Sequence, residues 1–363
     1  MDNMKSTWVK RAILAVLFIM ATVSVVQGIN NGMDHPGDFM WKAFRNVMYQ
    51  RTWGETYIPF TFWMFFPLGL FPETFARTLW IFINIVCTAV SAWALRKTFF
   101  RSMEQMEYVA LMLIMISGAA WRTNLSNGQY GLPAIAFFFL SVYFTERGKD
   151  LPAGLFLALS IYKYQLIVPV AVYYFFKKQY KTIAVAAGVL LLSLIATSIW
   201  LGSIYDATIK PLLISQNIGL GDAGDVDIES LLGLGDYIIP LFLIGIALLM
   251  MFAYLLRWRK DDLLFVSIGF FVAWALAYNR VYNFFPLIIP LGYSYAKMKS
   301  EDLVRIRFYR IEFIGLFLLT ASFFWLRTIS LEVGVTAERI LFYPVFALLL
   351  IDLFYYHRLQ VSR

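Results

Sequence analysis

The sequence predicts an all-α fold, a polytopic transmembrane bundle of about 10–13 helices. Hydrophobic residues make up 60% of the 363 positions and charged residues only 15%, whereas soluble domains are about half apolar and a quarter charged. The apolar residues gather in about a dozen runs, and the basic residues lie between these runs. We expect residues 1–363 to form a single membrane-embedded domain.

The apolar runs set the order of the expected elements. They are 12–29, 57–72, 75–95, 107–121, 131–144, 153–176, 182–201, 237–256, 263–278, 284–296, 313–326 and 340–354. Several are shorter than the roughly 20 residues that cross a bilayer, so polar flanks extend these helices or some runs are re-entrant. Run 12–29 follows three basic residues as a signal peptide would, but no small-x-small cleavage site follows it. A first transmembrane helix is therefore predicted there.

The net charge of +8 is interpreted as a topology signal rather than as a nucleic-acid surface. In the second half, the loops assigned to the inner side carry Lys177, Lys178, Lys181, Arg257, Arg259, Lys260, Lys297, Lys299, Arg305, Arg307, Arg310, Arg358 and Arg363, and those assigned to the outer side carry only Lys210, Arg280, Arg327 and Arg339. Basic loops stay cytoplasmic and attract anionic membrane lipid. Both termini are therefore predicted on the cytoplasmic side of a bacterial inner membrane.

The first half fits this rule less simply. Strict alternation of spans places 96–101 and 147–149 outside, although both segments are basic. Two short hairpins that do not cross, one at 57–72 and one around Lys163, would place both segments inside.

Few residues are available for metal or redox chemistry. The single cysteine, Cys87, excludes an intrachain disulfide, and His35 and His357 are far apart in sequence. No metal site and no cofactor are predicted.

Two outer segments are long enough to hold structure, 30–56 and 202–236, the second glycine- and acid-rich and expected to be mobile. In the first, apolar positions recur at helical spacing after Asp38, which predicts an interfacial helix. Asp38 could cap that helix. Alternatively, its carboxylate could take a proton from an attacking sugar hydroxyl.

Three further motifs carry polar groups beside apolar runs. Residues 121–130 include Arg122, Asn127 and Gln129, which could satisfy helix ends or bind sugar and phosphate oxygens. Lys163 interrupts a long apolar run, where a lysine either snorkels to the interface or marks a function such as pairing with a lipid phosphate. Asn279 and Arg280 lie at an outer helix junction, where Arg280 could hold a phosphate or simply end a helix. Four other polar residues in or near spans are expected to pair within the bundle: Arg77, Asn84, Glu312 and Asp352.

The short motifs named above, together with several others, follow one another in a definite order along the chain. The order is Gly37-Asp38-Phe39, Tyr57-Ile58-Pro59, Leu70-Phe71-Pro72, Trp80 to Asn84, Asn127-Gly128-Gln129, Glu146-Arg147-Gly148 and Lys163. In this order the chain resembles the polyprenyl-phosphate-sugar-dependent membrane glycosyltransferases of the GT-C fold, family eighty-seven, which includes bacterial mannosyl- and arabinofuranosyltransferases. The family usually has a second proline after Tyr-Pro, where this chain has Phe60, and often a late histidine, which is missing here.

The resemblance implies a GT-C-like bundle and an inverting, metal-independent transfer of a sugar from polyprenyl phosphate. The acceptor would be a glycolipid, a polysaccharide or a protein. Asp38 would be the base, and Lys163 and Arg280 would offset charge on the departing lipid phosphate. The remaining substrate contacts would come from Lys42, Tyr57, Arg122, Asn127, Gln129 and Asn279.

Two other classes of function remain open. A transporter or flippase for a lipid-linked glycan should carry charges through the whole depth of the bundle. An inactive assembly subunit would leave the lysine and the clustered polar motifs without a role. The gathering of polar groups toward one face favours the enzyme.

Overall fold

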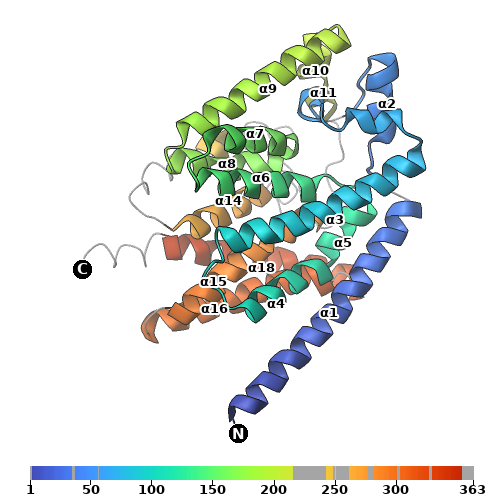
Figure 1. Cartoon of the computed structure of the whole chain (residues 1–363). Helices are drawn as coiled ribbons and strands as arrows, with labels where there is room; N and C mark the ends of the chain where they lie inside the picture. The colour runs from blue at the N-terminus through green and yellow to red at the C-terminus, as the bar shows by residue number, and fades with distance from the viewer. Residues whose placement is uncertain are drawn as a thin grey trace.

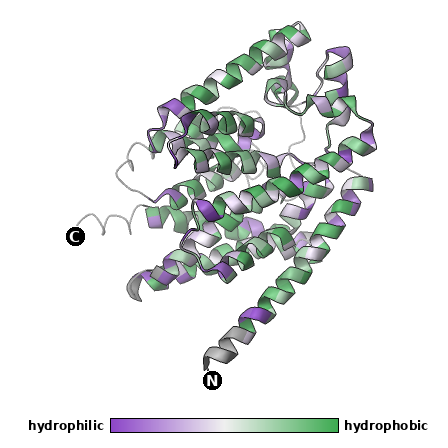
Figure 2. Ribbon diagram, in the orientation of Figure 1, coloured by the Kyte–Doolittle hydropathy of each residue, from purple (hydrophilic) through white to green (hydrophobic). Residues whose placement is uncertain are grey.

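The computed structural model describes residues 2–34, 37–55, 57–215, 243–247, 250, 261–276, 281–300, 303–326 and 329–353. Every regular element among these residues is helical, so the all-α bundle is confirmed (Figure 1). Apolar residues cover most of the ribbon, and hydrophilic residues gather at helix ends (Figure 2). One contiguous core includes side chains from Met40 to Leu353.

Six helical stretches are long and apolar enough to cross a membrane, so this is a multi-pass membrane protein. They are Trp8–Asp34, Glu73–Lys97, Asp150–Phe176, Tyr180–Leu201, Arg305–Leu326 and Glu332–Ile351. A bent pair, α4 (Gln105–Ser117) and α5 (Ala119–Ser126), adds a seventh if its 53° break lies within one span. Two apolar helices are shorter, Gly131–Thr145 and Asp262–Ala275. Several of the dozen apolar runs are therefore short or broken helices.

The first helix, α1 (Asp2–Asp34), is long and packs along α4 and α5. Gly28 and Gly32 lie one turn apart on it, and a Cβ at Gly32 would lie 2.8 Å from the Leu125 carbonyl oxygen. Small residues at this spacing allow helix backbones to approach closely in a membrane. Because α1 continues to Asp34, the first connecting segment begins later than the expected residue 30.

Run 57–72 does not form a membrane-spanning helix. It contains two short 3₁₀ helices, η1 (Pro59–Thr61) and η2 (Phe66–Leu70), because Pro59, Pro67 and Pro72 remove backbone donors. The next helix long enough to cross a membrane is α3 (Glu73–Lys97). The absence of a span-length helix among the described residues of 57–72 is consistent with a non-crossing segment there, one way to reconcile the charge rule with the apolar runs.

The helical stretch 150–176 folds back on itself. It contains α7 (Asp150–Ser160), η3 (Ile161–Lys163) and α8 (Tyr164–Phe176). The Ser141 hydroxyl of α6 (Gly131–Thr145) donates to the Ala153 carbonyl at 2.6 Å and accepts from the Tyr174 hydroxyl at 2.6 Å. In a straight helix, Ala153 and Tyr174 would be about 31 Å apart. The chain therefore reverses at η3 and places Lys163 at the tip of a hairpin, which is consistent with the non-crossing hairpin considered there.

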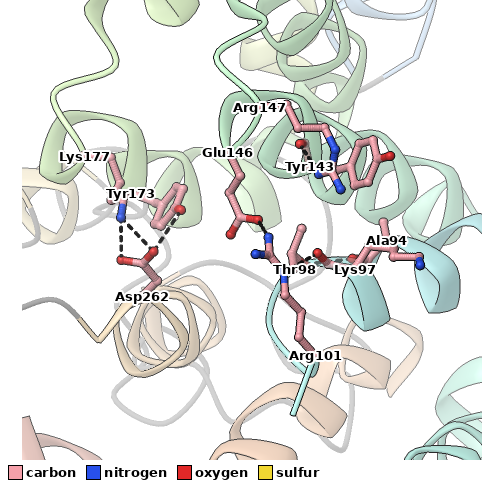
Figure 3. Close-up of polar contacts among 10 residues, drawn as sticks. All are labelled: Ala94, Lys97, Thr98, Arg101, Tyr143, Glu146, Arg147, Tyr173, Lys177 and Asp262. Atoms are coloured by element: carbon pink, nitrogen blue, oxygen red, sulfur yellow. Dashed lines mark hydrogen bonds and ion pairs between the residues drawn. The ribbon is translucent and has the colours of Figure 1, made fainter. Parts of the chain in front are cut away.

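Five ion pairs lie at one end of the bundle, and Figure 3 shows two of them. Arg101, after α3, pairs with Glu146 at the end of α6, and Lys177, after α8, pairs with Asp262 of α14 (Asp262–Leu276) at 2.8 Å. Three more pairs connect Lys10 with Glu104, Lys297 with Asp261, and Lys299 with Glu107. We call these pairs the ion-pair belt. The belt places 96–101 and 147–149 at the same end as the basic N-terminus.

The described beginning of the segment 202–236 is largely helical. After α9 (Tyr180–Leu201), the chain forms the short helices α10 (Ile204–Ala207) and α11 (Ile209–Ser215), and residues 216–236 lie outside the described residues. Ser203 caps α10 by accepting a hydrogen bond from the Asp206 amide, which favours a helix where a mobile loop was expected.

The C-terminal half completes the bundle with α14, η5 (Val281–Asn283), η6 (Phe285–Leu287), α15 (Ile288–Ser300), α16 (Leu303–Ala321), a π-helical turn (Ser322–Leu326) and α18 (Leu331–Ile351). Asp352 accepts hydrogen bonds from Tyr293 and Tyr309, and Glu312 accepts one from Ser294. Arg77 donates to the Met33 carbonyl at 3.0 Å and Asn84 to the Trp80 carbonyl at 2.8 Å. Asp352, Glu312 and Arg77 therefore pair with other elements as expected, whereas the Asn84 side chain donates within its own helix and its Oδ1 has no partner among the described residues.

Candidate functional site

The segment that carries Asp38 is attached to the turn between α5 and α6. The Asp38 amide donates to the Asn127 carbonyl at 2.9 Å, and its carboxylate Oδ2 accepts a hydrogen bond from Gln129 Nε2. Helix α2 (Trp41–Gln50), where an interfacial helix was predicted, begins three residues later with Met40 at its N-cap. The alternative that Asp38 caps this helix is therefore wrong, and its carboxylate is held by a different element.

Residues 127–130 form the turn that receives Asp38. Gly128 has φ +68°, and a Cβ there would lie 2.7 Å from Phe39 Cβ, so both the conformation and the close approach require glycine. The Gly128 carbonyl accepts from Trp80 Nε1 at 3.0 Å, and the Tyr130 hydroxyl accepts from the Met40 amide at 2.9 Å. Bonds to the turn on both sides of Asp38 thus fix its backbone.

Lys163 is buried at the tip of the α7–α8 hairpin. Its side chain reaches the same turn: Nζ donates to Tyr57 Oη at 3.0 Å and to Gln129 Oε1 at 3.3 Å. The rings of Tyr57 and Tyr282 each lie with their centres 5.2 Å from the ammonium, within cation–π range. The residue is 1% exposed, so it does not snorkel to a surface. Within the described part of the chain it forms no ion pair with a carboxylate.

Asp38, Gln129, Lys163 and Tyr57 therefore form one hydrogen-bonded row, which we call the carboxylate–lysine row. These residues come from the α1–α2 connection, the α5–α6 turn, the α7–α8 hairpin and the segment before η1. Asp38 and Tyr57 are partly exposed, whereas Gln129 and Lys163 are buried. The row places a carboxylate that can accept a proton near a cation that can offset negative charge.

A second acid, Glu55, lies near the row and was not singled out from the sequence. Trp53 Nε1 donates to the Tyr57 carbonyl at 2.7 Å, which closes the loop that carries Glu55. Partial burial raises the pKa of Glu55 above its usual 4.5. The only sequence signal was an acid two residues before Tyr57.

The other residues predicted to contact substrate do not join the carboxylate–lysine row through their side chains, or lie outside the described residues. Asn127 contributes its backbone carbonyl to Asp38, while its side chain accepts from the Ser126 hydroxyl at 3.3 Å. Arg122 points to α1 and donates to Gln27 Oε1 at 2.8 Å, and Lys42 is exposed on the first turn of α2. Asn279 and Arg280 lie outside the described residues. Their neighbour Tyr282 lies at the row, and its carbonyl accepts from Asn124.

The comparison with protein families decides the identity. The family model described as glycosyltransferase family 87 matches residues 56–277, more than half of the chain. The chain belongs to glycosyltransferase family 87. No curated protein and no solved structure matches the chain significantly. The family resemblance expected from the ordered motifs is confirmed.

Family membership makes this protein a glycosyltransferase, whose substrates are a sugar donor and an acceptor. The matched region contains Tyr57, Gln129 and Lys163, whereas Asp38 precedes it. The fold nevertheless connects Asp38 to Gln129. Among the described residues no three His, Cys, Asp or Glu side chains come together as metal ligands.

Proposed function

We propose that this glycosyltransferase moves a mannose- or arabinofuranose-like sugar from polyprenyl phosphate to an acceptor at the outer face of a bacterial inner membrane. The observation that carries the proposal is the carboxylate–lysine row, in which Asp38 and Lys163 hydrogen-bond to the two ends of one amide. The acceptor would be a hydroxyl group of a glycolipid, a polysaccharide or a protein.

In the proposed reaction, Asp38 takes the proton of the acceptor hydroxyl, and the hydroxyl oxygen attacks the anomeric carbon of the donor sugar. The bond between that carbon and the phosphate oxygen breaks, and its electron pair leaves with the polyprenyl phosphate. Attack opposite the leaving group inverts the anomeric configuration. Lys163 stabilises the negative charge that grows on the phosphate. Because a lysine supplies this positive charge, we propose that no metal takes part.

The proposed orientation rests on the ion-pair belt. Lys10, Arg101, Lys177, Lys297 and Lys299 belong to it, and basic residues remain on the cytoplasmic side. Asp38 follows α1, whose other end carries Lys10, so the carboxylate–lysine row would lie toward the outer face. The C-terminus is also proposed to be cytoplasmic, although 354–363 lie outside the described residues.

The first experiment tests Asp38 as the base. In liposomes supplied with polyprenyl-phosphate-mannose or polyprenyl-phosphate-arabinofuranose, Asp38→Asn should lower sugar transfer about 10²–10⁴-fold, because an amide cannot accept the proton. An unchanged melting temperature would show that the variant still folds. Full transfer by a folded Asp38→Asn variant would exclude Asp38 as the base.

A further inference from the structure

The amide of Gln129 separates the two charges of the carboxylate–lysine row. Its Nε2 donates to Asp38 Oδ2, and its Oε1 accepts from Lys163 Nζ at 3.3 Å. A carboxylate only accepts hydrogen bonds and an ammonium only donates them, so the two neighbours determine which way the amide points. The Gln129 side chain is 2% exposed, which leaves it little contact with solvent.

The arrangement keeps Asp38 and Lys163 from forming an ion pair. A direct pair would use each charge to satisfy the other, in a short and strong contact. Here the ammonium instead contacts Gln129 and the Tyr57 hydroxyl, at 3.0 Å. Asp38 Oδ2 is occupied by Gln129, whereas Oδ1 accepts no hydrogen bond from the described residues. One carboxylate oxygen is therefore available to an incoming hydroxyl.

We propose that Gln129 is a positioning residue that holds the base and the leaving-group cation one amide apart. This inference rests on the proposed transfer from a lipid phosphate. The separation lets Asp38 act on the acceptor while Lys163 acts on the phosphate, on opposite sides of the anomeric carbon. Each polar atom of the Gln129 side chain already has a protein partner, and the residue is buried, so the structure favours a positioning role over the substrate contact expected from the sequence.

A double-mutant cycle in thermal unfolding tests the positioning without any substrate. Gln129→Glu places a carboxylate oxygen against Asp38 and should lower the melting temperature by several degrees, because like charges repel. Gln129→Glu also sets a carboxylate oxygen against Lys163. Adding Asp38→Asn restores an amide–carboxylate hydrogen bond, with the amide donor now at position 38. The double variant should regain at least half of the lost melting temperature. If the losses of the two single variants simply add, the inference is overturned.

Activity supplies a second readout. With Gln129→Glu the acid limb of the pH profile of kcat/KM should move up by about one pH unit or more, because a neighbouring carboxylate raises the pKa of the base. A raised KM with an unmoved acid limb would indicate a substrate contact and would contradict the inference. The matched control is Tyr174→Phe, which removes a buried hydrogen bond to Ser141 at the far end of α6. The control should lower the melting temperature and leave the acid limb in place.

The two readouts separate this inference from the proposed function. If the natural protein transfers no sugar from either polyprenyl phosphate, the proposed donor class is wrong, and the unfolding cycle still decides whether Gln129 is coupled to Asp38. If transfer occurs and the unfolding effects add, only the positioning role fails.

Discussion

At the scale of single residues, Lys163 is the least expected feature of a membrane bundle. A lysine that is almost fully buried loses its hydration, and the two hydrogen bonds and two tyrosine rings around it replace only part of that loss. A cation in such surroundings interacts strongly with a phosphate placed beside it, because water does not screen the charge. The cost of burying Lys163 is thus consistent with a role in leaving-group stabilisation.

Lys163→Met should lower kcat for sugar transfer about 10²–10³-fold, as happens when one preorganised electrostatic group is lost. The melting temperature should stay the same or rise, because a buried charge without an ionic partner is removed. Steady-state kinetics and thermal unfolding measure the two effects. Lys149→Met is the control, since Lys149 is exposed beside the ion-pair belt. An unchanged kcat for Lys163→Met would exclude the phosphate role.

Glu55 gives a pH-dependent prediction. Partial burial raises its pKa above 4.5 in the folded protein, so the protonated form is favoured there. The contribution to stability is complete below pH 4.5 and is lost as pH rises through the folded-state pKa. Glu55→Gln should therefore raise the melting temperature at pH 7 to 8 and have little effect near pH 4. Melting curves across this range check the sign, and a variant that is less stable at pH 8 would contradict it.

At the scale of elements, the site is built where helices stop. The α5–α6 turn, the η3 break and the loop before η1 each replace a helical segment with backbone that can direct side chains toward one point. In a membrane such breaks need partners for the freed backbone groups. Here the Asn127 carbonyl accepts from Asp38, the Gly128 carbonyl from Trp80, and the Tyr130 carbonyl from the Tyr162 hydroxyl at 3.1 Å.

Gly128→Ala should reduce both stability and transfer. The left-handed conformation alone costs an alanine about 1–2 kcal/mol, and the new Cβ would also push against Phe39, next to Asp38. Gly148→Ala is a matched control, because Gly148 has φ +67° but nothing within 4 Å of an added Cβ. Gly148→Ala should lose stability only. Equal losses of transfer activity in the two variants would show that the close approach of Gly128 to Phe39 does not contribute to activity.

At the scale of the whole molecule, the two ends of the bundle have different chemistry. One end carries the ion-pair belt, in which each charge has a partner of opposite sign. The carboxylate–lysine row lies beyond the far end of α6, and there Asp38 and Lys163 are held apart. The far end also holds two ion pairs within single turns, Arg77 with Glu73 and Lys210 with Asp206, but the two charges of the row are not paired with each other. This asymmetry favours an enzyme over a transporter, which needs polar groups along the whole path.

The proposed orientation can be tested by cysteine labelling. After Cys87→Ala, Lys42→Cys and Lys149→Cys place single thiols on exposed positions of α2 and of the α6–α7 connection. A membrane-impermeant maleimide applied to intact spheroplasts should label Lys42→Cys at once. It should label Lys149→Cys only after the membrane is permeabilised. The reverse pattern would invert the proposed topology.

The sequence predicted much of the architecture. Composition and apolar runs predicted the all-α bundle, and the excess of basic residues at 96–101 and 147–149 pointed to two non-crossing segments. The contacts made by single polar residues could not be predicted from composition and apolar runs. Asp38 was as suited to a helix cap as to a base, because both roles need only an acid before an amphipathic stretch. The choice depended on which partner came within hydrogen-bond distance.

The sequence by itself determined that this chain lies in a membrane and that its motifs follow the order of family 87. Hydrophobicity and motif order are properties of the chain read along its length, and no contact is needed to recognise them. Only the tertiary structure decided that Asp38, Gln129, Lys163 and Tyr57 share one hydrogen-bonded row, and that Glu55 lies near it while Arg122 turns to α1. These relations join residues 34 to 106 positions apart, and they depend on where helices break and fold back, which local periodicity does not encode.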